Sequence, residues 1–202
     1  MPTEVAKLAD RLLDQKELKV ASDLAKILSD DESLEIQLVG SMVDKILPAY
    51  WDIKDEREPQ IDPSPIFRPL YYLHGYSNLA DFGKFTGELV EMASAHLEAC
   101  MQWLTLTPAE EWNGGRDFSK LITLLRDADV LPPRLAGDLQ DFDRVANAPP
   151  EDSGSESPGR PRFSIEDAAL LLIITRKLSI QLFELLNSHG VTIEHPWPPL
   201  KA

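Results

Sequence analysis

Apolar residues recur at helical spacing throughout residues 1–50. Thr3 can cap the first of three short stripes, and Pro48 marks the approximate end of the third. The stripes consist of Val5, Leu8, Ala9, Leu12 and Leu13, then Val20, Leu24, Ile27 and Leu28, then Leu34, Leu38, Met42, Val43, Ile46 and Leu47. Because spacings of three and four residues place side chains on one helix face, this pattern predicts three short antiparallel helices.

Residues 51–76 break this helical pattern. The segment is charged at its start and then contains prolines, which forbid regular structure. These prolines are Pro59, Pro63, Pro65 and Pro69. Two interpretations stay open: the segment is a Pro-rich linker at a domain boundary, or it is a long loop pinned to the core of a single domain.

A long helix is predicted from Ser77 or Asn78 to about Leu106. Its apolar positions follow the three-four spacing of a helix that is packed along its length. These positions are Phe82, Phe85, Leu89, Ala93, His96, Cys100 and Trp103. Gly83 and Gly87 lie one turn apart on the same helix, where each glycine costs about 1 kcal/mol relative to alanine. We therefore expect a close backbone contact there, in the core or at a homodimer interface.

Two shorter helices and a loop follow. The first helix comes after the turn at Gly114 and Gly115, and Pro132 with Pro133 opens the second. Their apolar positions are Phe118, Leu121, Ile122, Leu124 and Leu125, then Leu135, Leu139, Phe142 and Val145. Residues 148–162 are rich in Pro, Gly, Ser and acidic residues, a composition that predicts a mobile surface loop.

Ser164 can cap a final long helix, whose middle, Ala168–Ile174, is apolar on every side. Such a helix is either buried centrally in its own bundle or shared with a second copy of the chain. We expect it to end between Asn187 and Gly190, and the Pro-rich tail of residues 189–202, with Trp197, to run over the surface. Since no alternating apolar and polar run predicts a strand, the predicted fold class is all-α.

The net charge restricts the possible partners. The 202 residues include 34 Asp and Glu against 20 Lys and Arg, a formal charge of −14. Binding along a phosphate backbone needs clustered Lys and Arg, so we expect no nucleic-acid partner. The sequence contains no run of about 18 apolar residues, the length that would predict a membrane span. The start at Met1 lacks the basic and apolar blocks of a secretory signal, and with one cysteine in the chain we expect a cytoplasmic location.

Motifs for catalysis, cofactors and metals are absent or incomplete. The stretch Gly83–Gly87 lacks the spacing of a phosphate-binding loop and lies within a predicted helix. Cys100 and His96 lie on the buried stripe, where a thiol acts as a small apolar side chain and a histidine is hydrogen-bonded in the core. The other candidate ligands are expected to be solvated: His189, His195, Asp138, Asp141 and Asp143. We expect no cofactor and no metal.

Three stretches occur in a familiar order in the C-terminal half. They are FTGELVE at 85–91, LITLLRDADVLPP at 121–133 and LQDFDRVAN at 139–147. With a loop and a final helix from Phe163, this layout resembles the HEPN superfamily of four-helix domains, named for higher eukaryotes and prokaryotes nucleotide-binding. The resemblance covers residues 77–188 and leaves residues 1–50 as an N-terminal helical extension.

The resemblance implies a four-helix up-down bundle that dimerises and, in many members, cuts RNA without a metal. The motif in those members is an arginine, a polar residue and, a few residues later, a histidine. If Arg144 is the arginine, Val145 replaces the polar residue; if Asn147 is the polar residue, Ala146 replaces the arginine. Neither register supplies the histidine.

Three functions remain as hypotheses. The preferred one is a non-catalytic, HEPN-like domain that acts through protein–protein contacts, as a homodimer or with another protein. The first alternative is a metal-independent ribonuclease toxin with displaced catalytic residues, for which Arg144, Asn147 and His74 are the candidates, with Arg116 as a further arginine. The second is an acidic inhibitor that mimics nucleic acid. Without the motif histidine, we expect no enzyme activity.

Overall fold

The computed structural model describes residues 3–29, 69, 86–105, 117–147, 163–191 and 193–200, and the regular structure within them is entirely helical. The helices are α1 (Glu4–Leu12), α2 (Gln15–Ser29), α5 (Thr86–Leu104), α6 (Phe118–Asp127), α7 (Pro133–Ala146) and α8 (Ile165–Ser188). For this part of the chain, the prediction of an all-α fold is confirmed. The predicted third helix, the Pro-rich segment apart from Pro69, and the loop 148–162 lie outside the described residues.

Capping side chains begin the helices where the sequence predicts them. The Thr3 hydroxyl accepts a hydrogen bond from the Ala6 N–H at 3.0 Å, and the Ser164 hydroxyl accepts one from the Asp167 N–H at 3.0 Å. Pro133 opens α7, where its missing N–H costs nothing. Gly190 follows α8 with a φ of 84°, a left-handed conformation that favours glycine and ends the helix.

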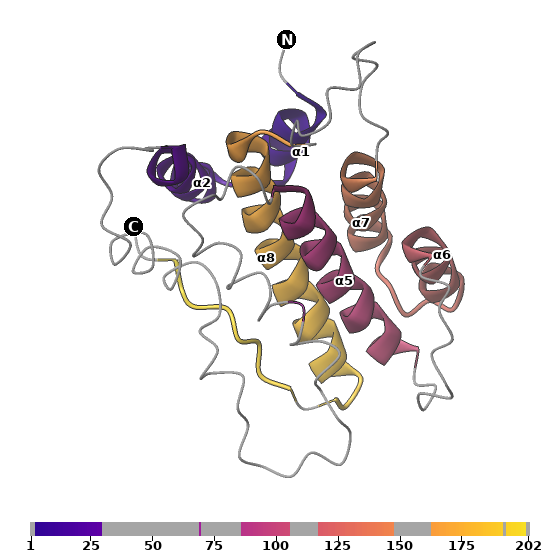
Figure 1. Ribbon diagram of the computed structural model, residues 1–202. Helices are drawn as coiled ribbons and strands as arrows, with labels where there is room; N and C mark the ends of the chain where they lie inside the picture. The colour runs from indigo at the N-terminus through magenta and orange to yellow at the C-terminus, as the bar shows by residue number, and fades with distance from the viewer. Residues whose placement is uncertain are drawn as a thin grey trace, which may run out of the picture.

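Helix α8 lies at the centre of the molecule (Figure 1). It packs along α5, while α1 and α2 cover its other side; α6 and α7 pack against α5, and α7 also contacts α1 and α8. The apolar residues of these helices form one continuous core. Among the described helices, none is both long enough and apolar enough to cross a membrane.

The apolar stretch of α8 is buried within its own chain. In Ala168–Ile174 every side chain except that of Leu170 is at most 2% exposed. Of the two alternatives that the sequence leaves open, the structure has central burial, with the N-terminal helices as part of the cover. The stretch therefore presents no surface for a homodimer, and the reason for expecting one through α8 is removed.

Polar contacts attach the N-terminal helices to α8. Asp14 and Glu17 form a reciprocal capping box at the start of α2, because each carboxylate accepts the backbone N–H of the other, at 2.8 and 2.9 Å. The same Glu17 oxygen accepts a bond from the Lys177 ammonium at 2.7 Å. At the other end, the Thr3 hydroxyl donates to Asp167 at 2.7 Å. Two separate points of α8 are thus held by residues from the start of the chain.

The acidic face of α7 differs from the solvated face that the sequence predicts. Asp138 is only 7% exposed, and its carboxylate accepts a hydrogen bond from the Arg11 guanidinium of α1 at 3.0 Å. The same guanidinium also binds Asp141. The prediction of a solvated face is therefore wrong for Asp138, because a partner 127 positions away compensates its charge.

The tail also differs from its prediction. Residues 193–200 lie against the core instead of running free over the surface, and the Trp197 side chain is only 2% exposed. His189 and His195 are exposed, as the sequence predicts. The prediction was wrong for Trp197 because a proline-rich composition describes the backbone and contains no information about where an aromatic ring is buried.

We expect Glu17→Ala to lower the free energy of unfolding by about 2 kcal/mol, because it removes the cap of α2 and the partner of Lys177. Urea denaturation measures this change. Glu17→Gln is the matched control: it keeps an acceptor for the Asp14 N–H and should lose about half as much. Equal losses in both variants would mean that the ion pair of Glu17 with Lys177 stabilises the start of α2, and that the hydrogen bond to the Asp14 N–H does not.

Candidate functional site

Hollows of similar size lie between three sets of helices. A groove of about 650 Å³ lies between α2 and α8. A second hollow, of about 470 Å³, lies between α7 and α8, and a third, of about 480 Å³, lies between α5, α6 and α7. Their linings differ in chemistry. The side chains in each determine what it can bind.

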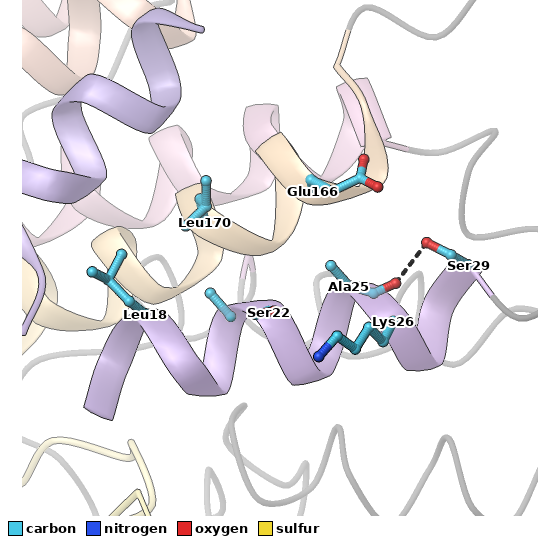
Figure 2. Close-up of a pocket in the computed structure, with 8 residues that line it drawn as sticks. Leu18, Ser22, Ala25, Lys26, Ser29, Glu166 and Leu170 are labelled. Carbon is cyan, nitrogen blue, oxygen red and sulfur yellow. Dashed lines mark hydrogen bonds between the residues drawn. The ribbon is translucent and has the colours of Figure 1, made fainter. Parts of the chain in front are cut away.

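The groove between α2 and α8 is lined mainly by small and apolar side chains (Figure 2). Leu18 and Leu170 lie at one end, and Lys26 and Glu166 come from opposite walls. Lys26 has its nearest acidic partner on its own helix, Asp23 at 3.9 Å. With no paired titratable groups across it, this groove offers little chemistry.

The hollow between α7 and α8 has a mixed lining. Arg134, Asp138 and Glu184 contribute both signs of charge, and Gln181 contributes an amide. Asp138 is already bound to Arg11. The lining therefore favours neither an anion nor a cation.

The third hollow, which we call the acidic hollow, is lined by four carboxylates. Glu91 and Glu98 come from α5, Asp117 precedes α6, and Asp143 lies near the end of α7. Apolar atoms of Val90, Met92 and Phe118 complete the wall beside Ala95 and Ala146, together with Gly87, Ser94, Ser119 and Asn147. None of the described lining residues is a lysine or an arginine.

A polar stripe on an otherwise apolar helix forms one wall of the acidic hollow. Gly87, Glu91, Ser94 and Glu98 follow one another at spacings of four, three and four residues, so they share one face of α5. Within the chain no close contact forms at Gly87, because a Cβ there would meet nothing within 4 Å. Gly83 lies outside the described residues.

The carboxylates of the acidic hollow differ in their electrostatic environments. Partial burial raises the pKa of Asp143; the hydrogen bond from the Asn147 amide, at 2.6 Å, opposes this, and the negative charge of Asp117 adds to it. Hydrogen bonds from the Lys120 side chain and backbone lower the pKa of Asp117. Burial thus disfavours the charged form of Asp143, which a nearby cation would stabilise.

The acidic hollow suits a cationic side chain better than a metal ion. Within the described parts of the chain, no group of three or more His, Cys, Asp or Glu side chains is placed to hold a metal. A lysine or arginine instead has an apolar stem that can contact Val90 and Phe118 while its charged end meets the carboxylates.

Of the ribonuclease candidates, Arg144 and Asn147 lie within the described residues, three positions apart at the end of α7. Arg144 is exposed on α7 and pairs with Asp141 at 3.1 Å and with Glu4 at 3.7 Å. Asn147 caps the end of α7 and lines the acidic hollow. His74 and Arg116 lie outside the described residues.

His189 and Arg144 lie near opposite ends of α8. Arg144 contacts Glu4, the neighbour of Thr3, and Thr3 binds Asp167 at the start of α8. His189 follows the other end of this helix, 22 residues and so about 33 Å beyond Asp167. His189 therefore supplies no proton-transfer partner for Arg144.

His96 is a hydrogen-bonded core residue, as its position on the apolar stripe predicts. It is 0% exposed, and its Nε2 is 2.7 Å from the Ser179 hydroxyl of α8. The Cys100 sulfur lies one turn further, 3.8 Å from the same nitrogen. Burial raises the pKa of the Cys100 thiol, which keeps it protonated and unreactive.

Comparison of the chain with protein-family models, with curated proteins and with solved structures finds no match.

We expect the Cys100 thiol to be inert in the native protein, because it is buried and protonated. Ellman's reagent at pH 8 should release its chromophore only after guanidinium is added. Since the chain has a single cysteine, the signal reports this site alone. Rapid release from the native protein would contradict the buried assignment.

Asp143→Asn should raise the melting temperature at pH 7. The folded-state pKa of Asp143 lies above its ordinary value, so the folded protein binds this proton more tightly than the unfolded chain does. The stability that protonated Asp143 contributes is therefore lost as the pH rises through its folded-state pKa. Asparagine removes the cost of ionising this carboxyl and keeps an acceptor for the Asn147 amide.

Thermal melts of Asp143→Asn at pH 3 and pH 7 test this sign. The gain should be present at pH 7 and absent at pH 3, where the wild-type carboxyl is protonated. Asp10→Asn, at an exposed position on α1, is the control and should show no such pH dependence.

Proposed function

We propose that this chain is a non-catalytic, HEPN-like helical domain that binds a positively charged segment of another protein in the acidic hollow. One observation carries the proposal. Glu91, Glu98, Asp117 and Asp143 line a single hollow of about 480 Å³, and its described lining contains no basic residue.

The chemistry of the hollow favours a lysine or arginine side chain as the anchor. Such a side chain loses little by burying its aliphatic stem, while its charged end can meet the carboxylates of Glu91 and Asp143. A cation beside Asp143 would stabilise its charged form, because burial and Asp117 both oppose its ionisation. A nucleic acid would meet the like charge of these carboxylates.

A different protein is a better partner than a second copy. Two copies would each carry a formal charge of −14 and would repel one another at low ionic strength. The apolar stretch Ala168–Ile174, the earlier reason for a homodimer, is covered within the chain. We therefore propose a heterotypic contact.

The HEPN-like part of the proposal is supported by helix order and packing. α5, α6, α7 and α8 follow one another as the resemblance implies, and α5 contacts each of the other three. The non-catalytic part is supported by the surroundings of Arg144, which pairs with Asp141 and Glu4.

A fluorescein-labelled octalysine peptide tests the proposal by anisotropy. The double variant Glu91→Gln with Asp143→Asn should bind it about tenfold more weakly than wild type, since one exposed and one half-buried charge contact are together worth about 1.4 kcal/mol. The matched control is Asp10→Asn with Glu184→Gln, which changes the net charge equally at exposed positions outside the acidic hollow. It should lose about twofold or less.

Two results would contradict the proposal. Equal losses in both double variants would mean that the peptide binds the overall charge and not the acidic hollow. Cleavage of labelled single-stranded RNA in EDTA, abolished by Arg144→Ala, would favour the ribonuclease alternative instead.

A further inference from the structure

The C-terminal segment, residues 193–200, lies on α8 as an extended peptide lies on a receptor. Its first residue, Ile193, exchanges two hydrogen bonds with the Asn187 side chain, at 3.0 and 3.1 Å. Further along, the Trp197 indole N–H donates to the Ser179 hydroxyl at 2.7 Å, and the Pro198 carbonyl accepts from Arg176 at 2.9 Å. The segment therefore runs back along α8, in the direction opposite to the helix (Figure 1).

The spacing of these contacts matches a polyproline-like chain. Asn187 and Ser179 are eight residues apart on α8, which corresponds to about 12 Å. Ile193 and Trp197 are four residues apart, which also corresponds to about 12 Å in the polyproline II conformation. The prolines at 196, 198 and 199 favour that conformation and leave few backbone N–H groups that need a partner.

Trp197 is the anchor of the C-terminal segment. Its side chain is 2% exposed, and its ring meets the edge of the His96 ring at 5.9 Å between centroids. A large ring with one satisfied polar atom, seated in a pocket and flanked by prolines, is a common arrangement in peptide recognition. Among the described residues, His96 of α5 and Ser179 of α8 contact this ring.

The C-terminal segment satisfies this site incompletely. Arg176 is 9% exposed, and its Nε is buried with no hydrogen-bond acceptor, while a Nη nitrogen has only the Pro198 carbonyl. Burial lowers the pKa of Arg176, although the charge of Glu17 opposes this. A buried guanidinium normally binds a carboxylate through two parallel hydrogen bonds, and a single carbonyl is a weaker partner.

We propose that this face of α5 and α8 is a peptide-binding site, which the C-terminal segment occupies in cis, and that its full ligand is the C-terminus of another protein ending in Trp-Pro. In such a ligand the terminal carboxylate takes the place of the Pro198 carbonyl. One oxygen keeps the existing bond to Arg176, and the second is available to the unsatisfied Nε. The remaining contacts, to Ser179 and the Trp197 pocket, stay the same.

Two synthetic peptides test this proposal with the full chain. Both have the sequence VTIEHPWP, residues 191–198, with a fluorophore at the N-terminus; one ends in a free carboxylate and the other in an amide. They are titrated into the Trp197→Ala protein, in which the cis segment has lost its anchor but Arg176 and Ser179 are unchanged. The carboxylate peptide should bind about tenfold more tightly than the amide, since a charge-assisted bidentate pair replaces a neutral bond.

The net charge makes this comparison decisive. A chain with a formal charge of −14 repels an additional carboxylate, so non-specific attraction would favour the amide peptide. Wild type should bind both peptides at least about tenfold more weakly than Trp197→Ala, because the cis segment competes at a high effective concentration. The carboxylate peptide should also raise the melting temperature of Trp197→Ala and leave that of wild type unchanged.

Asn187→Ala is the second variant, in case Trp197→Ala does not fold. Asn187 is exposed and bonds to Ile193, so its loss removes this contact from the cis segment and from both peptides alike. Arg176 and Ser179 are unchanged, and the ratio between the affinities of the carboxylate and amide peptides is the readout. No saturable binding to the folded variants, equal affinity for the two peptides, or equal binding to wild type would each overturn the proposal. When Asn187→Ala is combined with Glu91→Gln and Asp143→Asn, the triple variant should still bind the carboxylate peptide. This result separates the peptide-binding site from the acidic hollow.

Discussion

The burial of α8 on every side is the constraint on which the rest of the fold depends. Because the stretch Ala168–Ile174 is apolar on every side of the helix, several elements must cover it to exclude water. α5, α1 and α2 do this directly, and α7 closes the remaining gap with α1 through the bond between Arg11 and Asp138. Because the surrounding helices are committed to α8, their outward faces remain for polar chemistry, and the acidic hollow forms where α5 meets α6 and α7.

Local features could be predicted from the sequence because their signals are local. The capping residues Thr3 and Ser164, the proline that opens α7 and the buried position of His96 each follow from neighbours within a few residues. The capping box of Asp14 and Glu17 has an equally local signal, an acidic residue followed three positions later by glutamate. It could have been found in the same way and would have placed the start of α2.

Contacts between distant parts of the chain could not be predicted. Asp138 resembles a solvated acid until Arg11, 127 positions away, is brought to it, and Trp197 resembles a surface residue until its pocket is known. The acidic hollow has a partial signal in the stripe from Gly87 to Glu98, but its other carboxylates come from α6 and α7. A single sequence shows which face of each helix is apolar. It does not show which other helix that face packs against.

The position of α8 in the chain has a consequence for synthesis. α1 and α2 are made first, yet their apolar faces pack on a helix whose contacts with them are 160 to 164 residues away in sequence. Until that helix leaves the ribosome, the nascent chain carries two amphipathic helices with no lasting cover. Native contacts of such large sequence separation slow folding and prolong the exposure of apolar surface. It follows that this protein can complete its core only after α8 has been synthesised.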